Sequence, residues 1–297
     1  MIASIFPISG QAQTPHATRD DSRNRLEKHG TCATTIVAPF GAAFIIDSRL
    51  TETLGDQIVS QHPGCKVLLA RPSILLAGVG VEDTTGRAGH WNSLDEASNG
   101  LKKLPENPTK AQLDQWASAW GTTLENHYRQ AREKPNAPAF PLSEMLLVTR
   151  VGNEFYFKRA GVEWDGVMFK ITIAGQVLDE TIPQVEFAGL CRKWVGHDDG
   201  DGHLIPPQDR THGDDQRMRW YERRRAEAKT VDDLRSAALG LESVLTDMDE
   251  RLEGKQAGIA PPYANAEWAA EDKGWTTHFN AECESKAGAF GGPKSSP

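Results

Sequence analysis

The feature that most constrains this fold is a pair of short apolar runs at residues 34–38 and 42–47, separated by Pro39, Phe40 and Gly41. The two runs, TTIVA and AAFIID, are almost continuously apolar and too short for ordinary helices, which favours strands buried on both faces. The Pro-Phe-Gly sequence between them is typical of a tight turn. We therefore predict a β-hairpin in the core of the protein.

Further strand runs follow along the chain. A second hairpin is predicted at residues 66–81, and the Gly152-Asn153 turn separates two more runs. Single strands are predicted at residues 167–175 and 263–272. The chain is therefore rich in antiparallel strands.

Two capping boxes predict the starts of helices. Gln112 follows Thr109 by three residues, and Asp233 follows Thr230 by three residues. Apolar side chains recur at helical spacing after each of them. The order of elements, with strands on both sides of each helix, favours an α+β fold of two sheets flanked by helices.

Composition excludes some classes of partner. The formal net charge of −8 argues against nucleic acid as the main ligand, because a face that binds phosphates must be basic. No apolar run approaches the roughly 20 residues that cross a bilayer, so no membrane partner is expected. No cysteines have C-x-x-C spacing, and no metal or other cofactor is expected.

The chain is expected to divide into a leader, one domain and a tail. Residues 1–30 read as a leader, a propeptide or the remnant of a secretion signal. Residues 31–280 form the domain, with a polar insertion at about 195–230, and residues 281–297 are expected to be disordered. Because the N-terminal apolar stretch is short and no basic residue precedes it, we expect a cytoplasmic protein, with export to the periplasm or beyond as the alternative.

Five residues carry a pattern of fixed intervals. Gly41 lies ten residues after Thr31, at the predicted turn, and Asp47 lies sixteen residues after Thr31, at a strand end. Lys66 begins the third strand run, and Gly80 follows Lys66 by fourteen residues. This pattern resembles the proteasome-type N-terminal nucleophile (Ntn) hydrolases, and among them the catalytic β subunits of the proteasome.

The resemblance implies both a fold and an activity. The fold is a four-layer αββα sandwich of two antiparallel sheets flanked by helices. The activity is hydrolysis of an amide or peptide bond by a threonine-type peptidase or amidohydrolase, after autocleavage of the Gly30–Thr31 bond. A peptide or small amide substrate and assembly into a homo-oligomer are also implied, although the polar insertion argues against simple packing into a standard ring.

The residue types suit this chemistry. A threonine freed at a chain start can use its own α-amine as the general base. The resemblance assigns Lys66 to favour deprotonation of the Thr31 hydroxyl, and Asp47 to keep Lys66 charged and oriented. It assigns the N–H of Gly80 to the oxyanion, an interaction worth roughly 3–4 kcal/mol in comparable sites. Cys32 is the alternative nucleophile, but cleavage one residue later would put Asp47 out of register with the family.

The sequence also departs from the family. A supporting serine after a later strand is replaced by Ile173-Ala174-Gly175, and a supporting aspartate and serine by Ala257 and Ala260. The alternative is therefore a catalytically inactive subunit of proteasome fold that serves assembly or binding. A further alternative is an exported binding protein in which Thr31 is incidental.

Strand alternation makes one prediction for the cysteines. If Thr31 and Lys66 meet on one face of a sheet, Cys32 and Cys65 both point to the other face. We predict that Cys32 and Cys65 are neighbours, joined by a disulfide if the protein is exported and packed as thiols if it is cytosolic.

Overall fold

The protein is described here by a computed structural model. The described residues are 26–29, 32–54, 57–80, 83–86, 89–131, 140–178, 183–189, 191, 195, 210–254, 259–279 and 283. They form an α+β fold, as predicted, and their strands make three five-stranded sheets in which every pairing is antiparallel.

The predicted N-terminal hairpin lies at the centre of the first sheet, called here the β2–β3 sheet. Its strands in spatial order are β13 (Gln184–Gly189), β2 (Cys32–Ala38), β3 (Gly41–Asp47), β14 (Tyr263–Ala269) and β15 (Thr276–His278). Every residue of β2 and β3 is buried, which confirms that both faces of these strands are covered.

The second sheet, called here the β7–β10 sheet, contains the other predicted hairpins. Its strands in spatial order are β12 (Phe169–Leu178), β11 (Glu154–Trp164), β10 (Phe140–Val151), β7 (Ile74–Gly80) and β6 (Val67–Arg71). The hairpin predicted at residues 66–81 and the turn at Gly152-Asn153 are both confirmed.

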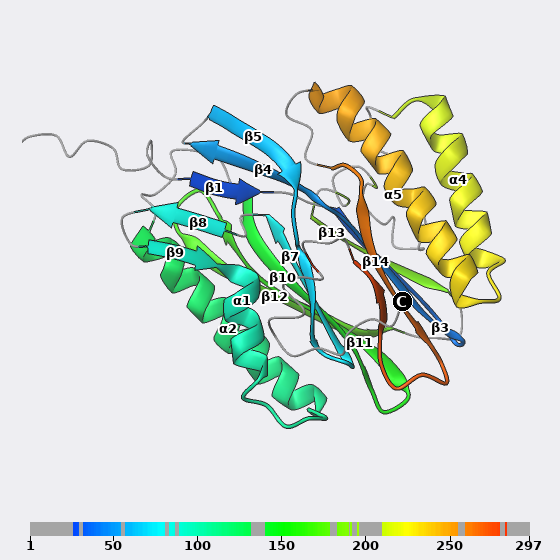
Figure 1. The fold of residues 1–297 in the computed structure, drawn as a ribbon, viewed down its shortest axis with the longest axis horizontal. Helices are drawn as coiled ribbons and strands as arrows, with labels where there is room; N and C mark the ends of the chain where they lie inside the picture. Colours follow the sequence, from blue (N-terminus) through cyan, green and yellow to red (C-terminus); the bar gives the residue numbers. More distant parts are fainter. Residues whose placement is uncertain are drawn as a thin grey trace, which may run out of the picture.

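Apolar side chains fill the space between these two sheets and two pairs of helices cover their outer faces (Figure 1). The inner core includes Phe44, Ile46, Leu146, Phe157 and Trp268. Helices α1 (Ser93–Leu101) and α2 (Lys110–Ala131) pack on the β7–β10 sheet, and α4 (His212–Ala226) and α5 (Val231–Glu253) lie on the side of the β2–β3 sheet.

Both predicted capping boxes are present. The side chain of Gln112 accepts from the backbone N–H of Thr109 at 2.9 Å, and Thr109 Oγ1 accepts from the N–H of Gln112 at 3.3 Å. Thr230 and Asp233 make the same reciprocal bonds at the start of α5. These bonds satisfy N–H groups that have no partner inside a helix, so each helix begins where the sequence predicted.

A third sheet was not expected from the sequence. Its strands in spatial order are β5 (Gln57–Pro63), β4 (Arg49–Leu54), β1 (Leu26–His29), β8 (Asp83–Gly86) and β9 (Gly89–Asn92). Strand β1 lies within the stretch that was expected to be a leader, and it pairs with β4 and β8 through backbone hydrogen bonds. Its sequence, LEKH, shows no run of apolar residues, which is why periodicity did not predict it.

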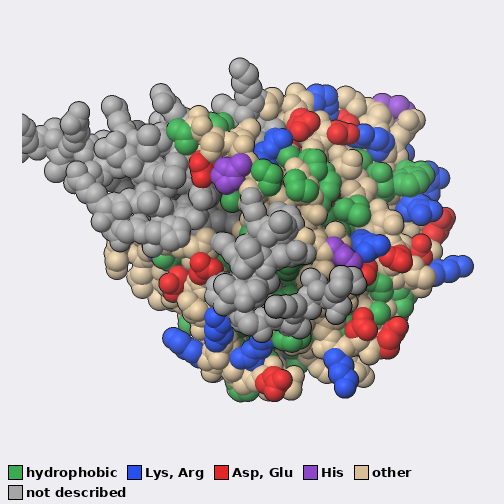
Figure 2. Space-filling model, in the orientation of Figure 1, with side chains coloured by type: hydrophobic (Ala, Val, Ile, Leu, Met, Phe, Trp, Pro, Cys, Tyr) green, Lys and Arg blue, Asp and Glu red, His purple; other side chains and the backbone are tan. Residues whose placement is uncertain are grey.

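Helix α4 lies within the stretch expected to be a polar insertion. Its mostly polar residues are held by the Thr211–Asp214 capping box and by ion pairs to α5, of which Arg217–Asp247 and Arg251–Asp214 are the shortest at 2.6 Å. Figure 2, drawn in the orientation of Figure 1, shows acidic and basic side chains interspersed on the described part of the surface in view. Met218 and Tyr221 also pack against the apolar core under α5. Two such side chains in a mostly polar helix make too weak a pattern for a search for apolar periodicity to detect.

Candidate functional site

A buried ion pair joins two of the residues that the sequence singled out. Asp47 ends β3, and Lys66 lies just before β6. Lys66 Nζ donates to Asp47 Oδ2 at 2.9 Å, and neither side chain has any solvent exposure. Two charges taken this far from water are tolerated only with close pairing and further hydrogen bonds.

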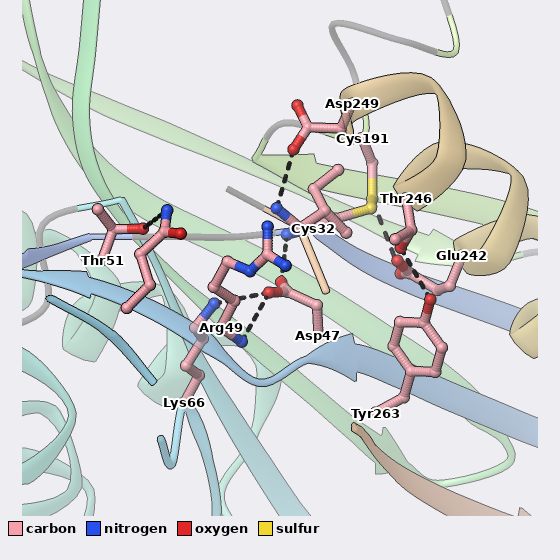
Figure 3. Close-up of polar contacts among 12 residues, drawn as sticks. Cys32, Asp47, Arg49, Thr51, Lys66, Cys191, Glu242, Thr246, Asp249 and Tyr263 are labelled. Atoms are coloured by element: carbon pink, nitrogen blue, oxygen red, sulfur yellow. Dashed lines mark hydrogen bonds and ion pairs between the residues drawn. A yellow bond between two sulfur atoms is a disulfide. The ribbon is translucent and has the colours of Figure 1, made fainter. Parts of the chain in front are cut away.

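The carboxylate of Asp47 also holds two backbone N–H groups. Oδ1 accepts from the N–H of Cys32 at 2.8 Å, and Oδ2 accepts from the N–H of Arg49 at 3.0 Å. The bond to Arg49 turns the chain between β3 and β4. The bond to Cys32 fixes the first residue of β2 against the Asp47–Lys66 pair (Figure 3).

Gly80 ends β7 with a φ of +86°, a backbone conformation that favours glycine. Two residues earlier in β7, the N–H of Gly78 donates to the carbonyl of Lys66 at 2.8 Å. Since a strand rises about 3.3 Å per residue, Gly80 lies roughly 7 Å along β7 from that contact. Thus Asp47 and Lys66 are in contact, and Gly80 is on the strand beside Lys66.

Thr31 and Gly30 lie outside the described residues, so the proposed nucleophile and the proposed cleavage bond have no described geometry. The nearest described neighbour of Thr31 in the chain is Cys32, whose N–H is held by Asp47.

Sequence reasoning missed a second buried carboxyl group beside the pair. Glu242 of α5 is completely buried and accepts from Thr34 Oγ1 at 2.9 Å. Burial first, and then the neighbouring Asp47 carboxylate, raises the pKa of Glu242 well above its ordinary value, whereas the Thr34 hydrogen bond and Lys66 act in the opposite direction. Another buried carboxyl group, that of Asp249, accepts from the N–H of Ile259 at 2.9 Å.

A sequence signal for these two carboxyl groups exists. Ala238, Glu242, Leu245 and Asp249 recur at steps of three and four residues, so all four lie along the buried face of α5. Two acidic residues inside an apolar stripe would have marked the interior site, because carboxyl groups are rarely buried without a partner.

The predicted pairing of Cys32 with Cys65 is wrong. Cys32 bonds to Cys191, with a Cα–Cα distance of 4.8 Å, and Cys65 bonds to Cys283, at 4.7 Å. The reason is that the two residues face different cores. Cys32 packs with the residues that lie under α5, whereas Cys65 packs in the core between the two sheets. Strand alternation alone could not predict this, because Cys65 precedes β6 instead of lying within a paired strand.

Cys32 and Cys191 form a group with Glu242 in which the sulfur and carboxylate atoms all lie within 4.8 Å of one another. Cys191 Sγ is 3.7 Å from Glu242 Oε1 (Figure 3). Among the described residues this is a donor set suited to a metal ion once the sulfurs are reduced.

None of the described helices is long and apolar enough to span a membrane.

No protein-family model matches this chain, and no curated protein matches it. A solved structure with a similar chain path is "Anbu (ancestral beta-subunit) from Yersinia bercovieri". The sequence identity is 11%, the TM-score is 0.45, and the match covers 88% of this chain and 93% of that one. A likeness at this level carries no argument about activity.

The assignment of the chain to the proteasome-type Ntn hydrolases is therefore corrected. No family model supports it, and the structural comparison reaches only a TM-score of 0.45 at 11% identity. The assignment depended on five positions between Thr31 and Gly80. A glycine at a turn, an aspartate at a strand end and a lysine at a strand start each have ordinary structural uses, so these few positions do not define a family.

Proposed function

We propose that this chain is an amide-bond hydrolase on a four-layer αββα scaffold, with Thr31 as its nucleophile. The observation that carries the proposal is the hydrogen bond from the N–H of Cys32 to Asp47, which is itself paired with Lys66. The residue directly after Thr31 is thereby tied to a buried cation–carboxylate pair. A cation held this close to a threonine hydroxyl would favour its deprotonation.

The first step would free Thr31. Its hydroxyl oxygen attacks the carbonyl carbon of Gly30, the peptide C–N bond breaks, and the nitrogen takes a proton. Water then hydrolyses the resulting ester to a Gly30 carboxylate and a free Thr31 hydroxyl and α-amine. Gly30 carries no side chain to obstruct this attack.

The freed residue would then act on a peptide or small amide. The α-amine of Thr31 takes the hydroxyl proton, and the charge of Lys66 stabilises the developing alkoxide. Asp47 acts as a positioning residue that orients Lys66. The N–H of Gly80 stabilises the oxyanion of the tetrahedral intermediate. Positioned proton transfer of this kind contributes about 10²–10⁴-fold in rate.

A second candidate function is binding or assembly without catalysis. The complete burial of Lys66 and Asp47 favours it, since a buried ion pair also serves as a purely structural connection between strands. Two surface hollows are lined by other residues than Asp47 and Lys66. One lies beside Arg217 and Trp220, and the other lies beside Arg150 and Trp268.

Intact-mass measurement with N-terminal sequencing separates the two functions. The hydrolase requires that the purified chain begin at Thr31, that Thr31→Val remain uncut, and that Thr31→Ser be cut. Valine keeps the shape of threonine without the hydroxyl, and serine keeps the hydroxyl, so the two variants form a matched pair. A wild-type chain that retains residues before Thr31, or a Thr31→Val chain that is cut equally, excludes the hydrolase and supports the binding function.

A further inference from the structure

A buried sulfur–carboxyl cluster lies between β2 and α5. The hydrolase proposed above, with Thr31, Asp47 and Lys66, gives no role to the side chains of this cluster. The cluster consists of Cys32, Cys191 and Glu242, which have no exposed surface. Their potential ligand atoms all lie within 4.8 Å of one another. Three donor groups that are distant in sequence, on β2, at residue 191 and on α5, therefore meet at one interior point.

Glu242 has one oxygen that the surrounding protein leaves unsatisfied. Thr34 donates to Oε1, whereas Oε2 is buried and has no hydrogen-bond partner. A buried polar atom without a hydrogen-bond partner destabilises the folded protein. The other oxygen of the same carboxyl group, Oε1, lies 3.7 Å from Cys191 Sγ. An incompletely satisfied, fully buried carboxyl group beside the two cysteines indicates a ligand that the three groups share.

We propose that the reduced cluster, with Cys32 and Cys191 as thiolates and Glu242 as a carboxylate, binds one Zn²⁺ ion. Zn²⁺ binds thiolate sulfur at about 2.3 Å and carboxylate oxygen at about 2.0–2.2 Å. Donor atoms within 4.8 Å of one another can reach a common ion once the S–S bond is open. Thiolate ligands favour zinc over the hard cations magnesium and calcium.

The electrons and protons of this change balance. A dithiol, or a phosphine with one water, supplies two electrons that break the Cys32–Cys191 bond and leave two thiols. Zinc binding then displaces the two thiol protons, together with the proton of a neutral Glu242 carboxyl group, to solvent. The dithiol becomes a disulfide, or the phosphine becomes its oxide. The same two cysteines are therefore joined by a disulfide in the oxidised protein and by zinc in the reduced protein.

Neighbouring groups suit the bound ion. Thr34 Oγ1 donates to Glu242 Oε1 at 2.9 Å and would orient the carboxylate, as hydrogen bonds to metal-binding carboxylates commonly do. Two thiolates and one carboxylate exceed the charge of Zn²⁺ by one. Lys66 is close enough to Glu242 to interact with it electrostatically and would offset that excess.

Cobalt binding tests the site directly. The full-length protein is reduced with a phosphine, freed of reductant, and titrated with Co²⁺, which replaces zinc and gives intense thiolate-to-cobalt absorption. We expect one equivalent to bind with this absorption, and Zn²⁺ to displace it. Absence of the absorption in protein whose four thiols are shown to be reduced overturns the proposal.

Two variants locate the ion. Cys191→Ser is expected to abolish the absorption, whereas Cys283→Ser is expected to retain it. The second variant is a matched control, because it removes a buried cysteine of the other pair, around which the described residues show no comparable donor group. Losing a group that only hydrogen-bonds to a metal ligand costs about 10–100-fold in metal affinity, so loss of a direct ligand in Glu242→Gln should weaken Zn²⁺ binding at least tenfold.

Alkylation of the wild-type protein gives a result that does not depend on how the variants fold. Peptide mapping after alkylation, with and without one equivalent of Zn²⁺, should show that the ion protects Cys32 and Cys191 but not Cys65 and Cys283. Equal protection of all four thiols, or protection of Cys65 and Cys283 alone, contradicts the assignment.

Discussion

Lys66 Nζ lies 2.9 Å from Asp47 Oδ2, and both side chains are fully enclosed by the protein. The same carboxylate holds the N–H groups of Cys32 and Arg49. One side chain thus connects the start of β2, the end of β3 and the segment that leads into β6. Stability should depend strongly on this contact.

Replacing Lys66 with methionine is expected to lower the free energy of unfolding by about 3–5 kcal/mol, because Asp47 would remain as a buried charge without its cation. Lys110→Met is the matched control. Lys110 pairs with Glu154 at 2.5 Å, but both side chains are at least 36% exposed, and loss of such a pair costs at most about 1 kcal/mol. Urea denaturation measures both values. If Lys66→Met and Lys110→Met lowered the free energy of unfolding equally, burial of the Lys66–Asp47 pair would not add to its contribution to stability.

The two disulfides are expected to be found as Cys32–Cys191 and Cys65–Cys283 in protein purified without reductant. Peptide mapping under non-reducing conditions checks the pairing, and a peptide joining Cys32 to Cys65 would contradict the structure. The Cys65–Cys283 bond joins residues 218 positions apart. Because such a link restricts the unfolded chain, Cys65→Ser with Cys283→Ser should lower stability by about 2–5 kcal/mol.

Gly41 and Gly152 both have positive φ angles, of 151° and 66°, but their surroundings differ. A Cβ at Gly41 would collide with the carbonyl oxygen of Trp268 and with Val231, whereas a Cβ at Gly152 would meet nothing within 4 Å. Gly152→Ala should therefore cost about 1–2 kcal/mol, from backbone conformation alone. Gly41→Ala should cost clearly more in thermal or urea unfolding. A larger loss for Gly152→Ala would contradict the packing at the β2–β3 turn.

Asp114 of α2 should make stability depend on acidity. Its hydrogen bond from Lys158, and then that from Tyr156, hold the pKa of Asp114 below its ordinary value. A carboxyl whose pKa is lower in the folded than in the unfolded state stabilises the fold above the unfolded pKa of about 3.9. That stabilisation is lost as the pH falls through the folded pKa.

Unfolding titrations between about pH 2 and 7 measure this contribution. Asp114→Asn should be less stable than the wild type at pH 7, and the difference should shrink at the acid end. Lys158→Met removes the largest cause of the shift and should reduce the same pH dependence. A difference between Asp114→Asn and the wild type that stays constant across the range would rule this contribution out.

Local patterns in the sequence were sufficient for much of the fold. The hairpin at residues 34–47, the turn at Gly152-Asn153 and the capping box of Thr230 with Asp233 are correct in the structure. Each depends on interactions between residues close in the chain, or on a run of apolar side chains that must leave water. The backbone-paired strand β1 and the ion-paired helix α4 lack such runs and were not predicted.

The candidate site was likewise predicted only in part from the sequence. The intervals in the sequence singled out Asp47 and Lys66 as partners, and they are in contact. They could not show that Cys191 and Glu242 lie beside Cys32, 159 and 210 residues away in the chain, because only the packing of α5 on the β2–β3 sheet brings these groups together. The sequence by itself determined the apolar hairpins of the two packed sheets and the starts of α2 and α5, since hydrophobic periodicity and capping act locally. The tertiary structure alone decided which cysteines pair and which carboxyl groups are buried, because each depends on the face of a sheet that another element covers.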